Sequence, residues 1–69
     1  MALTEFRVTG MTCEHCERSV REEVGAVAGV EHVEVNAQTG VLRVTADDAV
    51  DDAAILGAVD EAGYAATRV

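Results

Sequence analysis

The chain has 69 residues, 49% of them apolar, which leaves room for one small domain with a hydrophobic core and argues against disorder. Phe6 and Tyr64 are its only aromatic residues, so the core has to be built mainly from Val, Leu, Ile and Ala, and an elaborate enzyme pocket is not expected. The formal net charge is −8 and all five cations are arginines, which disfavours nucleic acid and anionic membrane surfaces as partners.

The ends of the chain show no targeting or linker composition. No apolar run approaches the roughly 20 residues that cross a bilayer, and the first ten residues lack the basic and apolar segments of a signal peptide. We therefore expect a single domain over residues 1–69 in the reducing cytoplasm, and the start at Met1 and end at Val69 favour a free protein. Two cysteines in that compartment more often bind metal or react than form a structural disulfide.

The first two predicted elements are a strand and a helix. Residues 3–9 alternate between apolar and polar character, with Thr4, Phe6 and Val8 on one face, and Gly10 ends this strand. Further along, the apolar residues take helical spacing, on the stripe Cys16, Val20, Val24 and Val27. The opposite, charged face carries Glu14, Glu17, Arg18, Arg21 and Glu22. Gly25 weakens the helix, and residues 28–30 are expected to stop it.

The second half of the chain predicts a hairpin, a helix and a short strand. Within residues 30–47, alternating segments flank the turn sequence "NAQTG". A helix is predicted within residues 47–63, with Asp51 as N-cap and Gly63 at the C-terminal cap. Its buried stripe is Ile55, Ala58, Val59 and Ala62, and residues 64–69 form the last strand. This order predicts an α+β, ferredoxin-like βαββαβ sandwich, in which a four-stranded antiparallel sheet carries both helices on one face.

The segment "GMTCEHC", residues 10–16, holds the residues with chemical potential. Cys13 falls in the loop after the first strand, and Cys16 falls in the first turn of the helix, where the helix N-terminus lowers a thiol pKa. Arg18 and Arg21 add positive potential, although neighbouring glutamates oppose it. This spacing brings both sulfurs to one exposed point. Two soft sulfurs are the ligands that Cu(I) selects without needing a third, whereas zinc normally takes four ligands.

A bare Cys-x-x-Cys pattern also occurs in redox dithiols and zinc sites, but the longer string is more specific. "GMTCEHC" between a strand and a helix, with "GV" before the hairpin and "EAGY" near the end, resembles the heavy-metal-associated (HMA) domain family. The resemblance covers essentially the whole chain. That family comprises copper chaperones and the N-terminal domains of copper-transporting P-type ATPases, and single-domain bacterial copper chaperones are the most similar members.

The resemblance implies a cytoplasmic copper chaperone that is not an enzyme. Cys13 and Cys16 would bind one Cu(I) and pass it by thiolate exchange to the N-terminal metal-binding domain of a copper-transporting P-type ATPase. Met11 would point into the core, Thr12 suits the copper branch of the family, and Tyr64 would lie beside the site, as in bacterial members. A copper-responsive repressor and a second copy of the chain, bridged by copper, are further partners to consider.

Other polar residues near the motif have less specific interpretations. His15 is interpreted as a solvated residue that tunes the thiolate pKa, because a side chain adjacent to Cys16 on a helix points elsewhere. His32 is interpreted as a surface residue. Arg18 and Arg21 either contribute to docking or pair with helix carboxylates, Arg21 with Glu17.

Three alternative functions stay open at this point. The first is a thiol–disulfide oxidoreductase, although the chain is short for a thioredoxin-type fold and lacks a Trp before its first cysteine. The second is an HMA module for another soft metal, mercury or zinc; zinc would need His15 or other ligands. The third is a metal-binding domain excised from a copper ATPase.

Overall fold

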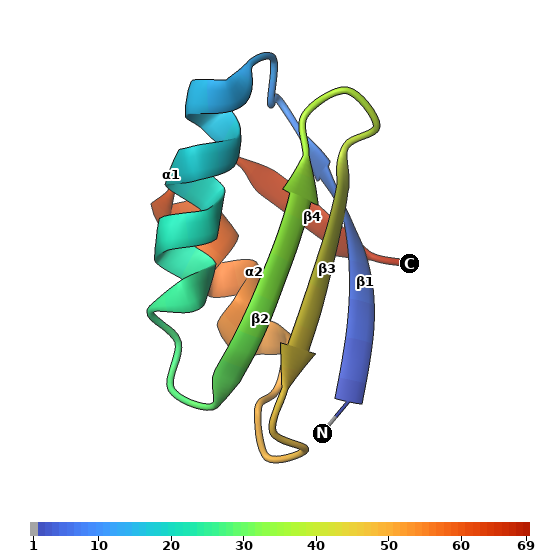
Figure 1. The fold of residues 1–69 in the computed structure, drawn as a ribbon, viewed down its shortest axis with the longest axis vertical. Coiled ribbons are helices and arrows are strands. Elements are labelled where there is room, and N and C mark those ends of the chain that lie inside the picture. The colour runs from blue at the N-terminus through green and yellow to red at the C-terminus, as the bar shows by residue number, and fades with distance from the viewer. Residues whose placement is uncertain (1) are drawn as a thin grey trace.

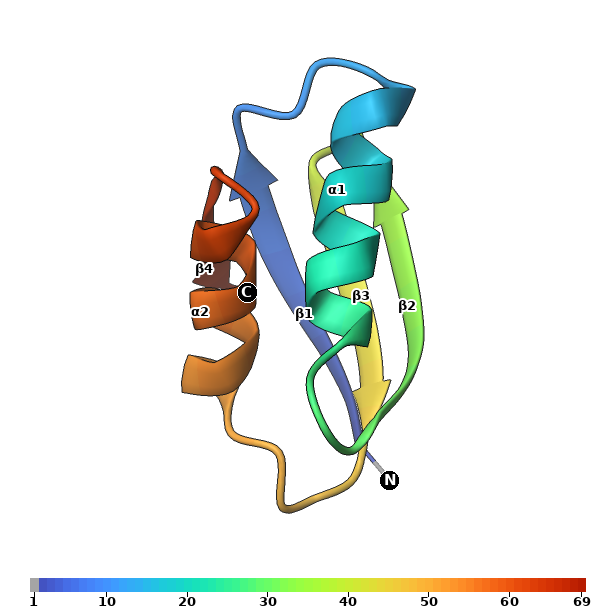
Figure 2. The same cartoon turned by 90° about the vertical axis from the view of Figure 1, so that its left-hand side faces the viewer.

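The structure is a computed structural model that describes residues 2–69. Its elements follow the order β1 (Ala2–Thr9), α1 (Glu14–Gly25), β2 (Val30–Asn36), β3 (Val41–Ala46), α2 (Asp52–Glu61) and β4 (Ala65–Arg68). The strands form one antiparallel sheet in the order β2-β3-β1-β4, and both helices cover the same face of it (Figures 1 and 2). The predicted ferredoxin-like βαββαβ fold is confirmed.

The core lies between the sheet and the two helices. Alternation in β1 turns Phe6 and Val8 inward. Of the predicted helical stripes, α1 buries Cys16, Val20 and Val24. In the second stripe Ile55 and Val59 are buried, whereas Ala58 and Ala62 are half-buried. Each fully buried side chain of this kind contributes about 1.5–3 kcal/mol relative to its exposed state. The largest fully buried side chains are Phe6, Leu42, Ile55, Val20, Val24, Val44 and Val59.

The prediction that α1 continues towards residues 28–30 is wrong, because the helix ends at Gly25. The following residues form successive turns, in which the Val27 N–H donates to the Val24 carbonyl at 3.1 Å and the Val30 N–H donates to the Val27 carbonyl at 3.1 Å. Val27 is half-buried and packs against the core from this turn. The apolar period therefore extends one turn beyond the helix that it indicates.

The start of α2 also differs in one detail. Asp51 precedes the helix in extended conformation, as an N-cap residue does, but its side chain makes no capping hydrogen bond. At the other end of α2 the Gly63 N–H donates to the Asp60 carbonyl and the Tyr64 N–H donates to the Val59 carbonyl. This pair of bonds around a left-handed glycine (φ +93°) is a Schellman motif, which confirms the predicted C-terminal cap.

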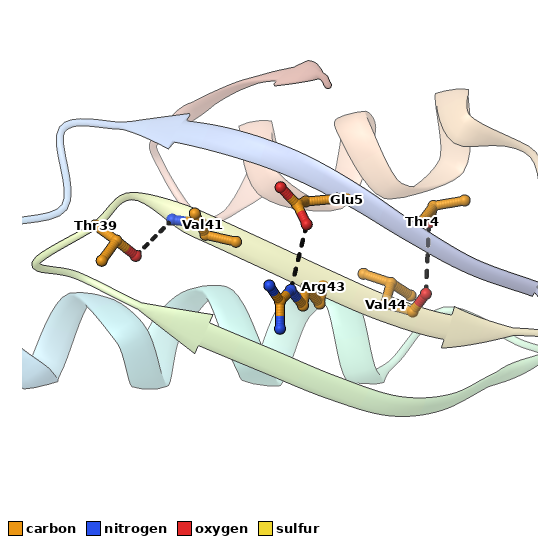
Figure 3. A network of polar contacts seen from close by, with 6 residues as sticks. All are labelled: Thr4, Glu5, Thr39, Val41, Arg43 and Val44. Carbon is orange, nitrogen blue, oxygen red and sulfur yellow. Dashed lines mark hydrogen bonds and ion pairs between the residues drawn. The ribbon is translucent and has the colours of Figure 1, made fainter.

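The sheet face away from the helices carries charged side chains together with the exposed Leu3. Arg43 on β3 reaches Glu5 on β1 with an N···O distance of 3.3 Å, and both side chains are exposed (Figure 3). At the β2–β3 turn the Thr39 hydroxyl accepts the Val41 N–H at 3.3 Å (Figure 3). The exposed Glu5–Arg43 ion pair contributes at most about 1 kcal/mol to stability. Within residues 2–69 no helix is both long and apolar enough to span a bilayer.

Candidate metal site

The two cysteines lie at the junction between β1 and α1. Cys13 is the residue before the helix, in extended conformation (φ −157°, ψ 173°), and its carbonyl accepts the N–H groups of Cys16 at 3.1 Å and Glu17 at 3.3 Å. This first helical turn folds Cys16 back towards Cys13. Both thiols are free, and their sulfurs are 3.5 Å apart. The structure therefore places the pair at the predicted strand-to-helix junction.

The expectation that both sulfurs lie at one exposed point is wrong for one of them. Cys13 is exposed, whereas Cys16 is 9% exposed and belongs to the core cluster. Cys16 begins the apolar stripe of α1 that continues with Val20, so the packing that buries the helix also buries this residue. A ligand approaching from solvent therefore meets Cys13 first.

The local hydrogen bonds favour the thiolate form of Cys16. The backbone N–H of Thr12 is the largest cause, followed by the Tyr64 hydroxyl and the Cys13 thiol, and together they lower the Cys16 pKa from 9.0 to about 6 against an opposing effect of burial. The same contact raises the pKa of Tyr64, because its hydroxyl holds its proton while donating to the sulfur. Arg18 and Arg21 are not among these causes, so the lowered pKa arises from the loop and not from helix cations.

Tyr64 reaches Cys16 because two glycines allow it. The left-handed Gly63 turns the chain back after α2, and Gly10 (φ +94°) lies close to the tyrosine ring. A Cβ on Gly10 would lie 3.3 Å from Tyr64 Cδ1, so any larger residue would crowd the ring and would also have to adopt a left-handed backbone. The structure thus brings together Tyr64, the cysteines and Thr12, whose Oγ1 is 3.9 Å from the Cys16 sulfur.

The remaining residues of the motif take different positions. Met11 is 8% exposed and sits in the core, so it faces away from solvent. His15 is exposed in the first turn of α1 and does not join a ligand cluster. Over the described residues 2–69, no group of three or more His, Cys, Asp or Glu side chains could hold a metal ion. The candidate donors that lie together are the two sulfurs, a set that would suit a low-coordinate soft ion better than a four-coordinate one.

One contact at the site has no counterpart in the sequence pattern. Glu17 belongs to the charged face of α1 by its spacing, but it is half-buried, and its Oε2 accepts the Ala37 N–H at 2.6 Å. The ion pairs among the described residues are Glu5–Arg43 and Asp52–Arg68, so the proposed Arg21–Glu17 pair is not among them. Helical spacing cannot reveal a bond between residues 20 apart, because that bond depends on how the hairpin packs on α1.

Known proteins resemble this chain over most of its length. The sequence is 42% identical over 62 residues to copper-transporting ATPase 2 of Rhizobium meliloti (strain 1021), a match that covers 90% of this chain but only 8% of the ATPase. It is 40% identical over 63 residues to the copper chaperone CopZ of Enterococcus hirae, covering 90% of this chain and 91% of CopZ.

The fold comparison agrees with these sequence matches. The crystal structure of a copper-binding domain from the P-type ATPase HMA7 superimposes with a TM-score of 0.95 at 30% identity, covering 100% of this chain and 95% of that domain. The heavy-metal-associated domain family matches residues 5–65, which include both cysteines and Tyr64. This chain therefore belongs to the heavy-metal-associated domain family.

Proposed function

We propose that this protein is a cytoplasmic Cu(I) carrier of one domain, which takes up one ion through the sulfurs of Cys13 and Cys16 and is not an enzyme. The observation that carries the proposal is the pair of sulfurs 3.5 Å apart, one on an exposed residue and one on a buried residue whose pKa is lowered to about 6. Metal ligands must be deprotonated, and a pKa of about 6 leaves Cys16 largely ionised at neutral pH. The proposed acceptor is the N-terminal metal-binding domain of a copper-transporting P-type ATPase, a class to which this chain is similar.

Transfer in this proposal is ligand exchange without a change of oxidation state. A thiolate of the acceptor forms a bond to the ion on the side of the exposed Cys13, giving a three-thiolate intermediate. One of the original sulfur–copper bonds then breaks, and a second acceptor thiolate replaces the remaining one. Each departing sulfur of this chain leaves the ion as a thiolate and can then take up a proton from solvent. Exposure of Cys13 supports this route, because the acceptor sulfur reaches the ion before either original bond is lost.

A Cu(I) titration in an oxygen-free, reducing buffer against a chromophoric Cu(I) chelator tests the proposal. The wild-type chain is expected to bind one equivalent, and a variant with both Cys13→Ser and Cys16→Ser is expected to bind none. Circular dichroism of the double variant verifies that it is folded. Binding that survives the double substitution, or no binding by the wild type, would refute the assignment.

Competition at the same site separates the other metals. Two sulfur donors within the described residues 2–69 favour Cu(I), so Zn(II) is expected to be displaced by Cu(I) under reducing conditions. Hg(II) is also a soft two-coordinate ion and is titrated in parallel. Preferential retention of Zn(II) or Hg(II) over Cu(I) would reassign the cargo, and rapid catalytic reduction of insulin would reassign the site to thiol–disulfide exchange.

A further inference from the structure

The β2–β3 turn is hydrogen-bonded to the chain on both sides of the β1–α1 loop, which carries Cys13. Figures 1 and 2 show this turn and the β1–α1 loop at the same end of the molecule. The Gly40 carbonyl accepts the Val8 N–H at 2.7 Å, on the strand that leads into the loop. The Ala37 N–H donates to Glu17 at 2.6 Å, on the helix that leads out of it. These two bonds hold the turn against the segment that carries the cysteines.

The first amide of the turn, that of Ala37, takes its acceptor from outside the turn, at Glu17. The turn satisfies its other amides itself, because Asn36 Oδ1 accepts the N–H groups of Gln38 at 2.8 Å and Thr39 at 3.2 Å. The Asn36 carbonyl accepts the Gly40 N–H at 2.9 Å. Glu17 and Ala37 are both half-buried, and a carboxylate that accepts an amide N–H makes a stronger bond than a neutral acceptor does.

A groove of about 340 Å³ separates the two segments beside Cys13. Thr12, Cys13 and the carboxylates of α1 form one wall, and Ala37 and Gln38 form the other. Cys16 is buried and has Tyr64 beside it, whereas the exposed Cys13 lines the groove. The position of the turn therefore sets how large a group can approach Cys13 from this side.

We propose that Glu17 is a positioning residue for metal exchange, which holds the β2–β3 turn as a fixed wall and so limits the size of the group that reaches Cys13. The proposal rests on the function proposed above, because the exchanged ion is bound at Cys13. Glu17 itself contacts neither sulfur nor cargo in this role; it acts through the Ala37 amide. A slender thiolate side chain on a partner loop passes the wall, and bulky ligands are slowed.

Two conservative variants separate the hydrogen bond from the charge. Glu17→Asp keeps the carboxylate but shortens the side chain by one methylene, which withdraws it from Ala37. Glu17→Gln removes the charge but keeps an oxygen that accepts the amide. Glu23→Ala, on the same helix and exposed, is the matched control for loss of a glutamate away from the groove.

The first measurement needs no metal. In the reduced apoprotein, the rate of Cys13 alkylation by a bulky dye-maleimide is divided by the rate with iodoacetamide, so that changes in thiolate reactivity cancel. We expect Glu17→Asp to raise this ratio at least about twofold and to speed hydrogen exchange of the Ala37 amide about tenfold, because the released turn opens more often. Glu23→Ala is expected to keep both values close to wild type, and Glu17→Gln, whose neutral oxygen is a weaker acceptor, is expected to lie between wild type and Glu17→Asp.

The second measurement uses the Cu(I)-loaded protein. A bulky Cu(I) chelator is expected to remove the ion faster from Glu17→Asp than from wild type, while the equilibrium affinity stays within about twofold, because neither sulfur loses a contact. An unchanged alkylation ratio in Glu17→Asp despite faster Ala37 exchange would overturn the proposal. So would an equal rise in Glu17→Gln without faster Ala37 exchange, because the alkylation ratio would then not follow the amide bond. Failure of Cu(I) binding would refute the proposed function but would leave the alkylation result standing.

Discussion

The two helices begin in the same way and use their first turns differently. Cys13 precedes α1 and Asp51 precedes α2, both in extended conformation and both without a side-chain capping bond. At α1, the first turn carries a buried sulfur that accepts hydrogen bonds from the preceding loop and from Tyr64. At α2, Asp52 instead binds Arg68 of the last strand at 2.6 Å.

The two helix starts therefore have different roles: the start of α1 affects the thiols, and the start of α2 holds its helix to β4. The start of α1 leaves Cys13 exposed, and the neighbouring hydrogen bonds lower the pKa of Cys16. The start of α2 joins its helix to β4, and the same arginine lies 5.9 Å from the centroid of the buried Phe6 ring. Changes at the first junction should therefore alter stability and thiol chemistry together, while changes at the second should alter stability alone.

The largest expected effect is at the loop before α1, where Met11 fills the core. Met11→Ala is expected to reduce the free energy of unfolding by about 2–5 kcal/mol, the usual cost of truncating a buried Met. Urea denaturation of the reduced apoprotein measures it. Met11→Leu conserves volume and should cost less than about 1.5 kcal/mol.

The same pair of variants tests whether Met11 is a ligand. Met11→Leu removes the thioether sulfur but keeps the packing, so Cu(I) affinity is expected to equal that of wild type. A loss of affinity of tenfold or more in a folded Met11→Leu protein would place the thioether on the metal and would contradict the core position of the side chain.

The contrast also shows what residue patterns can and cannot predict. The alternation around Phe6 and the helical spacing of Val20 and Val24 are local, and they predicted the element order, the fold and the inward faces. The end of α1 at Gly25 was missed, because the apolar residue Val27 continues the helical period while packing from a turn.

The sequence likewise predicted where the site residues lie, but not how each is buried or hydrogen-bonded. The positions of Cys13 and Cys16 follow from the strand–loop–helix order, and the family resemblance placed Tyr64 beside them. The burial of Cys16 is less obvious, because the same residue is both the start of the apolar stripe and part of the motif. The Glu17–Ala37 bond depends on the packing of α1 against the hairpin, which no local period encodes.

The next effect is a difference in the free energy of unfolding between serine variants of the two cysteines, measured without metal. Cys16→Ser replaces a sulfur at a buried position by a hydroxyl and should lower the free energy of unfolding by about 1–3 kcal/mol. Cys13→Ser changes an exposed side chain and should stay within about 0.5 kcal/mol of wild type. Urea denaturation at a single pH compares them, and equal losses in the two variants would show that the sites are not packed differently.

A third effect depends on pH. Because the folded-state pKa of Cys16 is about 6, below its ordinary 9.0, the folded protein binds fewer protons than the unfolded chain between those values. The Cys16 contribution should therefore be absent below about pH 6, rise with pH, and be complete above pH 9. Urea denaturation across this range should show the rise in wild type and not in Cys16→Ser.

Tyr64→Phe tests one cause of that shift. Loss of the hydroxyl removes a hydrogen bond to the thiolate, so the Cys16 pKa should move up towards its ordinary value while the Thr12 amide still holds it below. The thiolate absorbance, followed against pH in a Cys13→Ser background, measures the pKa of Cys16 alone. A pKa that is the same with and without the hydroxyl would remove Tyr64 from the site.

The smallest effect belongs to the start of α2. Asp52→Asn removes the charge that binds Arg68, and both side chains are more than 40% exposed, so the loss should be only about 0.2–1 kcal/mol. The loss should shrink in high salt, because an exposed ion pair is screened. The Cys16 pKa and Cu(I) affinity should not change, since the pair lies outside the contacts that act on the sulfur. A shift in that pKa on Asp52→Asn would show that the two helix starts are coupled and that closure and chemistry are not separate in this fold.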